Sequence, residues 1–228
     1  MTKIAPWTII TGRSVASYLY MDFITTFLTG MVGSSPIEII AFFLGLANVG
    51  LLMRRSIWNY PFGIAMVMLY AFIFYEAKLY SDMILQGFFV TIQVYGWWYW
   101  LNGNMAEDGH VIVRRLPPGY TLWYGCAAVI GVLALGTFMD SMTDAALPYP
   151  DATTTVLSVI AQILLARRYL ENWLVWIVVD VLAIGIYFVK GLYPTTVLYV
   201  IFLGMAIGGY LLWRRTWLSS QPERALSS

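Results

Sequence analysis

The sequence predicts an all-α integral membrane protein in which seven transmembrane helices form two parallel repeats of three, joined by a single helix. Three observations lead to this prediction. The 228 residues are 60% hydrophobic and 11% charged, with a mean hydropathy of +0.73, which is the composition of a membrane protein. Seven apolar runs are long enough to cross a hydrocarbon core of roughly 30 Å. The second half of the chain also repeats a pattern of residues from the first half.

The apolar runs are expected to be helices because lipid offers backbone amides no hydrogen-bond partner. Ser14 to Val32 is a weaker candidate, with Asp22 near its middle and many Ser, Thr and Gly residues, so we expect a helix that lies in the outer interface. An arrangement of eight spans is the alternative. The predicted spans are 36–53, 57–77, 79–101, 120–142, 152–166, 170–189 and 192–213.

The repeat determines how the spans are grouped. Adding 113 to the residue number places Arg54-Arg55 on Arg167-Arg168, Asn59 on Asn172, Tyr60 on Trp173, Leu79-Tyr80 on Leu192-Tyr193, Gly96 on Gly209 and Trp100 on Trp213. Spans one to three therefore match spans five to seven, and span four links them. Because the linker crosses once, the halves are parallel, as in SWEET-type transporters. The expected divisions are an N-terminal segment (1–35), a first repeat (36–102), a loop with the linker helix (103–148), a second repeat (149–215) and a polar tail (216–228).

Four arginine doublets predict the orientation. They follow the first, third, fifth and seventh spans, at 54–55, 114–115, 167–168 and 214–215. Cytoplasmic loops of membrane proteins carry an excess of Lys and Arg. The loop at 103–119 and the C-terminus are therefore predicted to be cytoplasmic.

Residues that match between the halves are expected to serve the fold. Asn59 and Asn172 precede apolar helices, so helix capping explains both. Gly96 and Gly209 are expected to allow close helix packing. Trp100 and Trp213 lie beside arginines, where anchoring in the aromatic belt of the membrane interface is the simplest interpretation.

Residues that differ between the halves are the candidates for function. Trp173, Trp176 and Asp180 are spaced to share one face of the sixth span, whereas Gly63 and Val67 replace the last two in the first half. Gln86 and Gln93 share a face of the third span, and their counterparts are Tyr199 and Ala206. An ionisable group in mid-membrane is costly unless its surroundings are polar, so we expect these residues to line a cavity. Hydrogen bonding between helices is the alternative for the glutamines. For Asp180 the alternative is a carboxyl group that is protonated or bound to a neighbouring helix, and for Trp173 it is an anchor at the membrane interface. An indole face, carboxamides and one acid would suit a small, flat, cationic ligand with polar groups.

Other function classes find little support. A net charge of +1 without a stripe of cations argues against nucleic-acid binding, and the single Cys126 against a disulfide framework or a Cys-rich metal site. The single histidine, His110, lies in a loop, and the spans contain no grouping of Ser, His and acid and no metal-ligand spacing. We therefore expect no enzyme activity and no cofactor. A retinal protein needs a lysine in mid-helix, but Lys78 and Lys190 lie at helix ends. A receptor that binds a vitamin without transporting it stays open.

One resemblance is specific. The segment from Gln86 through Gln93 to the aromatic run 95–100, together with the Asn-Trp-x2-Trp-x3-Asp element at 172–180, resembles the PnuC family of bacterial nicotinamide riboside transporters over about residues 36–214. The resemblance implies a SWEET-like fold, facilitated diffusion of nicotinamide riboside through the bacterial inner membrane, trapping by a separate cytoplasmic kinase, and a homotrimer. It also implies that the vitamin site is lined by Gln86, Gln93, Trp97, Asn172, Trp173, Trp176, Asp180 and Tyr199. Nicotinamide riboside members usually have Asn at the position of Asp180, so thiamine or another nucleoside-like vitamin is the alternative substrate.

Overall fold

The computed structural model describes residue 25 and residues 36–76, 80–103, 109–143, 146–189 and 193–220, and over this part of the chain all regular structure is helical. The helices are α2 (Pro36–Met53), α3 (Asn59–Glu76), α4 (Tyr80–Leu101), α5 (Pro118–Met142), α6 (Pro148–Ala166), α7 (Asn172–Val189) and α8 (Tyr193–Ser219). The seven predicted runs are thus confirmed as helices, although α8 continues into the segment predicted as a tail. The interfacial helix predicted within 1–35 lies outside the described residues, Thr25 apart.

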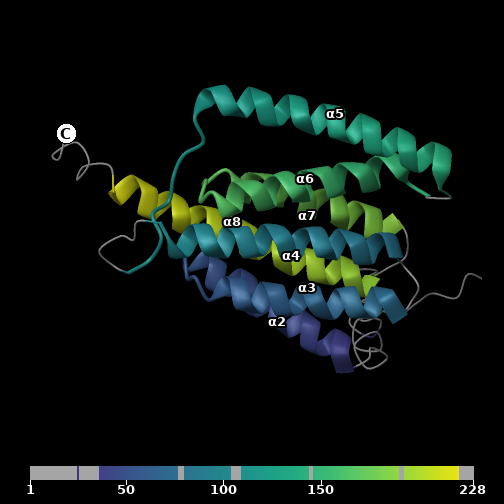
Figure 1. Cartoon of the computed structure of the whole chain (residues 1–228), viewed down its shortest axis with the longest axis horizontal. Coiled ribbons are helices and arrows are strands. Elements are labelled where there is room, and N and C mark those ends of the chain that lie inside the picture. Colours follow the sequence, from purple (N-terminus) through teal and green to yellow (C-terminus); the bar gives the residue numbers. More distant parts are fainter. Residues whose placement is uncertain are drawn as a thin grey trace, which may run out of the picture.

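The helices pack in two series that meet at both ends (Figure 1). In the first series α3 contacts α2 and α4, and in the second α7 contacts α6 and α8. Contacts of α4 with α6, and of α2 with α8, join the two series into a closed ring of six helices. The remaining helix, α5, packs on α6 and lies along the outside of the ring (Figure 1).

The outer surface of this bundle is apolar. Four of the described helices are long and apolar enough by themselves to cross a membrane, namely α2, α5, α7 and residues 195–219 of α8. Large apolar side chains such as Leu122, Ile130 and Phe188 are exposed on the surface. Exposed apolar area of this extent requires lipid or protein to cover it. The chain is therefore a multi-pass membrane protein.

The turns that lead into α3 and α7 have the same local structure. Arg55 and Arg168 both adopt left-handed backbone conformations, with φ of 58° and 64°. The side-chain amide of Asn59 donates to the carbonyl of Ser56 at 2.6 Å, and Asn172 donates in the same way to Tyr169 at 2.6 Å. The two asparagines therefore do stabilise the turns before the helices. However, the capping prediction was wrong about direction, because each amide donates to a carbonyl instead of accepting from a helix N–H.

Two matched tryptophans join the halves. The indole of Trp100 on α4 donates to the carbonyl of Ala166 at the end of α6 at 3.2 Å, and the indole of Trp213 on α8 donates to the carbonyl of Leu52 on α2 at 3.1 Å. Both side chains are fully buried, and their rings lie 6.2 Å apart. Trp173, 1% exposed, packs edge-on against Trp213. The prediction that these tryptophans anchor the protein in the membrane interface was wrong, since both are buried and each N–H donates to a backbone carbonyl near the end of a helix in the other half.

The matched glycines allow this packing. A side chain at Gly96 would collide with the ring of Tyr60, and one at Gly209 with the ring of Trp173. Tyr60 in turn packs edge-on against Trp100, with ring centroids 5.2 Å apart. The prediction of close approach at both glycines is confirmed.

Residues 109–117, which we call the connecting segment, cross the same end of the bundle. The backbone of Arg114 donates to the carbonyl of Arg168 and accepts from the amide of Leu170, at 2.9 and 2.8 Å. Val111 and Val113 are buried in the cluster that holds Trp100 and Trp213. We call this end, marked by Arg55, Arg114 and Arg168, the arginine end.

Candidate functional site

The interior of the ring is layered, and the layers can be placed from the arginine end inward. Trp100 and Trp173 both contact Trp213, so they lie at one level. An α-helix rises about 1.5 Å per residue. Gln93 lies seven residues before Trp100 on α4, and Asp180 lies seven residues after Trp173 on α7. Both are therefore about 10 Å deeper than the tryptophan level, at the same depth.

Four of the predicted site residues lie at or next to the tryptophan level. Trp173 is part of the buried aromatic cluster, and half-buried Trp97 and Trp176 pack against it. Asn172 is fully buried at the first residue of α7, where its amide nitrogen is occupied by Tyr169. Its Oδ1 atom has no hydrogen-bond partner among the described residues, and neither does Nε1 of Trp173. The hydroxyl of Tyr60, which packs against Trp100, is likewise buried without a partner among the described residues, so all three atoms have capacity for a further hydrogen bond.

Gln93 belongs to a group of amides around a glycine. It is buried, and its side-chain oxygen lies against the Cα of Gly63, where an added Cβ would overlap it. Asn48 of α2 approaches the same glycine and donates to the backbone carbonyl of Asn59 at 2.7 Å. Gly63 therefore leaves room for two carboxamides on neighbouring helices.

In the second half, large and small side chains exchange places at the matching positions. The counterparts of Asn48, Gly63 and Gln93 at the 113-residue offset are Ala161, Trp176 and Ala206. Both alanines are buried, with 0% and 3% exposure. A glycine flanked by two amides is thus replaced by an indole flanked by two methyl groups, which places an aromatic surface on one side of the interior and polar groups on the other.

Asp180 is the ionisable group at this depth. It is 3% exposed, and no hydrogen bond or ion pair from a described residue reaches it. The described helices of the ring have no Lys or Arg along α2, α3, α4, α6 or α7, and in α8 only Arg214 and Arg215 near its end. The residues described contain no group of acids, histidines and cysteines that could hold a metal ion. A buried carboxylate without a cation favours a ligand that brings its own positive charge.

Gln86 and Tyr199 form a deeper layer, about 21 Å from the tryptophan level by their distance along α4 and α8. Both are half-buried. The ring of Tyr199 stacks on Tyr187 of α7 at 5.2 Å, and Asp180 lies within electrostatic range of its hydroxyl. The predicted residues are therefore spread over three levels along the helices of the ring.

The sequence prediction missed Asn48 and Tyr187. Asn48 carried the same signal as the glutamines, because it is an amide within an apolar span and has alanine as its counterpart. Tyr187 carried no such signal, since one tyrosine among 16 in an apolar chain is unremarkable until a stacking partner is known.

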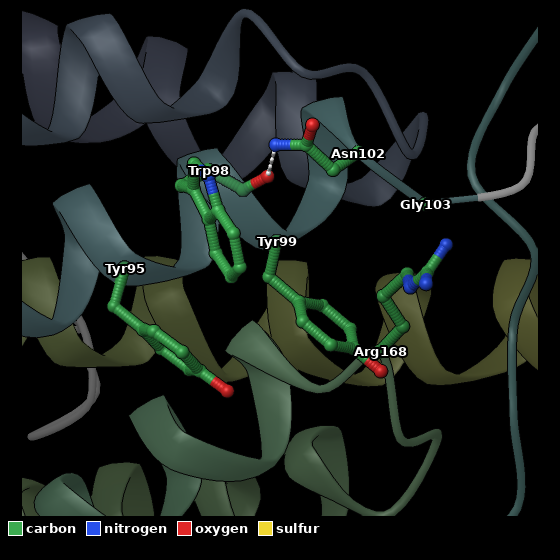
Figure 2. Close-up of a pocket in the computed structure, with 6 residues that line it drawn as sticks. All are labelled: Tyr95, Trp98, Tyr99, Asn102, Gly103 and Arg168. Atoms are coloured by element: carbon green, nitrogen blue, oxygen red, sulfur yellow. Dashed lines mark hydrogen bonds between the residues drawn. The ribbon is translucent and has the colours of Figure 1, made fainter.

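A separate cleft opens at the arginine end (Figure 2). It has a volume of about 390 Å³, and none of the predicted site residues lines it. The guanidinium of Arg168 lies over the ring of Tyr99, 4.9 Å from its centroid, and reaches the backbone at Gly103. The lining residues are Tyr95, Trp98, Tyr99, Asn102, Gly103 and Arg168.

Comparisons with known proteins agree with this architecture. Residues 35–215 match the family model described as "Nicotinamide mononucleotide transporter". The chain is 31% identical over 214 residues to the nicotinamide riboside transporter PnuC of Escherichia coli K12, covering 83% of this chain and 88% of that protein. It is 32% identical over 182 residues to PnuC of Neisseria mucosa, covering 75% and 69%, and 30% identical over 189 residues to the riboflavin/roseoflavin transporter RibM of Streptomyces davaonensis, covering 79% and 84%. A crystal structure of the vitamin B3 transporter PnuC superposes with a TM-score of 0.70 at 27% identity, over 92% of this chain and 95% of that one.

Proposed function

The chain belongs to the nicotinamide mononucleotide transporter family, and from this membership we propose that it transports nicotinamide riboside across the bacterial cytoplasmic membrane by facilitated diffusion. The observation that carries the choice of ligand is the interior level shared by Asp180 and Gln93, without a cation at that depth in the described helices. Nicotinamide riboside has a cationic pyridinium ring, an amide and ribose hydroxyls. The indole of Trp176 suits the ring, Asp180 the charge, and Gln93 the polar groups.

The positions of Asp180 and of the arginines favour the riboside over its phosphorylated form, the mononucleotide. A phosphate needs arginines, lysines or clustered N–H donors once water is removed. The arginines of the described helices and turns lie at the arginine end, about 10 Å from Asp180 or farther. A phosphate at the level of Asp180 would face a carboxylate instead, which repels it. The riboside avoids this cost.

The candidate residues have distinct proposed roles. Trp97, Trp173 and Trp176 supply aromatic surface at the tryptophan level, with Asn172 offering a carbonyl oxygen beside them. Gln93 and Asp180 hold the polar and charged groups one level deeper. Gln86 and Tyr199 line the path beyond, toward the other end of the ring.

We further propose that the ring consists of two parallel three-helix halves of the SWEET-like type, with α5 as the linker, and that all seven helices cross the membrane. The matched turns at Arg55 and Arg168, and the paired bonds of Trp100 and Trp213, support this arrangement. The turns and the two tryptophan donors recur after 113 residues, and the acceptors, Leu52 and Ala166, both lie near a helix end. Two like halves around a central site give a natural geometry for alternating access.

In this proposal the arginine end is cytoplasmic and is closed in the structure. Trp100 and Trp213 each bind a backbone carbonyl of the other half, and Val111 and Val113 of the connecting segment fill the space beside them. Release of the ligand to the cytoplasm requires these contacts to separate. The arginine doublets support the orientation. Trapping by a cytoplasmic kinase and assembly as a trimer complete the proposal by family resemblance.

The test is flux into sealed vesicles. The purified protein in proteoliposomes should take up radiolabelled nicotinamide riboside until the inside and outside concentrations are equal, without an ion gradient. Binding without flux would identify a receptor. Unlabelled mononucleotide, thiamine and riboflavin serve as competitors: a compound that competes more strongly than the riboside would replace it as the proposed substrate. Accumulation above equilibrium driven by protons or sodium would contradict facilitated diffusion.

A further inference from the structure

The cleft at the arginine end has a cationic floor and an aromatic rim. Arg168 lines it with a side chain that is almost entirely buried, held by the ring of Tyr99 and the backbone at Gly103 (Figure 2). Tyr95 and Trp98 form the rim and are exposed, with Trp98 at 59%. A buried guanidinium beside exposed aromatic faces is an arrangement that can hold an anion against an apolar body.

Further arginines converge on the same aromatic residues. Arg114 donates to the Tyr99 hydroxyl at 3.3 Å. Burial alone would lower the pKa of Arg167, but a hydrogen bond and electrostatic attraction to Tyr95 outweigh it, so the pKa is raised and the guanidinium stays charged. Glu171, on the following turn, pairs instead with Arg115 at 2.5 Å. Arg114, Arg167 and Arg168 therefore surround the cleft, whereas the charge of Arg115 is compensated by Glu171.

The aromatic residues that line the cleft are not repeated in the other half. The counterparts of Tyr95, Trp98 and Tyr99 are Gly208, Leu211 and Leu212, which offer no polar rim. Arg55 matches Arg168 in sequence and in left-handed backbone, but its guanidinium donates to the carbonyl of Val111 at 3.3 Å. Both turns thus have an arginine in a left-handed conformation, whereas the aromatic residues around Arg168 have no aromatic counterparts in the other half.

An apolar strip continues from the cleft along α4. Val94, Trp98 and Leu101 are spaced to share one helix face, and all three are at least half exposed. A ligand with a phosphate and an apolar chain would place the phosphate in the cleft and the chain on this strip.

We propose that the cleft binds the phosphate group of an anionic ligand, with Arg168 as the main contact and Tyr95 and Trp98 covering the adjoining apolar part. Two sources carry this chemistry: the headgroup of an anionic phospholipid and a free phosphorylated nucleotide. The site is distinct from the proposed transport site, since the two share no residue.

The experiment measures both sources on the full chain in detergent. Delipidated protein is titrated with dioleoyl phosphatidylglycerol and, separately, with dioleoyl phosphatidylcholine, and bound lipid is counted by native mass spectrometry. A second arm measures adenosine 5′-monophosphate against adenosine by calorimetry. The variants are Arg168→Gln and Trp98→Ala, with Arg55→Gln as the matched control in the other half. Trp98 is exposed, so its variant stays informative if Arg168→Gln does not fold.

We expect Arg168→Gln to weaken binding of phosphatidylglycerol about fivefold, the value of one cation at a membrane surface, about 1 kcal/mol. Trp98→Ala should weaken it as well, and Arg55→Gln should not. The same pattern with the monophosphate, and not with adenosine, would assign the cleft to a nucleotide. Equal binding of both lipids without preference for the monophosphate, or losses of equal size in Arg55→Gln, would overturn the proposal.

Discussion

Replacing Trp100 and Trp213 together by phenylalanine tests whether their paired bonds close the arginine end. The change keeps an aromatic ring at each position and removes the two indole N–H donors, whose acceptors are carbonyls 3.2 and 3.1 Å away in the other half. A hydrogen bond between membrane helices contributes about 0.6 kcal/mol on average, and a typical buried one about 1 kcal/mol. The closed state should therefore lose about 1.2–2 kcal/mol, which shifts the closed-to-open ratio about 7- to 30-fold.

The assay is labelling of a buried cysteine at that end. Cys126 is first replaced by serine, and Val113→Cys then places a thiol in the buried cluster beside the tryptophans. Inside-out vesicles are treated with a membrane-impermeant maleimide, and the labelling rate reports opening. Trp58→Phe, at an exposed tryptophan outside the cluster, is the control. An unchanged labelling rate in the double variant, with the control behaving like the parent, would refute the view that these bonds hold the end closed.

Three further predictions concern the interior and the orientation. Asp180→Asn keeps the shape of the side chain and removes its charge, so the affinity for nicotinamide riboside should fall tenfold or more. Opposite charges about 5–6 Å apart attract each other by about 3 kcal/mol at an effective dielectric constant near 20. Calorimetry with the neutral dihydro form should show a much smaller loss of affinity, and equal losses for both ligands would mean that the charge of Asp180 is irrelevant. Trp176→Ala should weaken binding roughly tenfold, or 1.4 kcal/mol, through lost stacking and cation–aromatic attraction, and unchanged affinity would remove the indole from the site. His110→Cys should resist labelling from outside intact cells, and strong labelling there would reverse the orientation.

The sequence was sufficient to predict the helices and several positions that share the same local structure. Apolar runs bounded by arginines and by Asn59 and Asn172 gave helix ends close to those in the structure, because lipid leaves a continuous apolar segment no alternative to a helix. The offset of 113 residues likewise identified positions with the same local structure, such as Gly96 and Gly209.

Side-chain direction could not be predicted in this way. Trp100 and Trp213 lie near helix ends beside arginines, which is equally typical of an interface anchor and of a buried residue at a junction of helices. Which of the two roles a tryptophan has depends on where the carbonyls of Leu52 and Ala166 lie in the folded protein. Each carbonyl belongs to the half of the chain that does not contain its tryptophan donor. The burial of Val111 and Val113 was missed for a related reason, since a short segment with charges and prolines nearby has the composition of a surface loop.

The exchange of volume between Gly63 and Trp176 has a consequence for how a molecule lies inside the ring. A perfectly repeated interior would accept a ligand equally well in two poses related by the pseudo-axis. The indole lies on α7, and the carboxamides lie on α2 and α4. In one pose the aromatic ring of the ligand would face the carboxamides and its hydroxyls would face the indole. In the other pose the ring faces the indole and the hydroxyls face the carboxamides. In the proposed two-fold arrangement, the side chains at these matched positions thus break the symmetry of the backbone. Because the proposed pseudo-axis runs along the membrane normal, this asymmetry determines which side of a ligand faces α7 and which side faces α2 and α4.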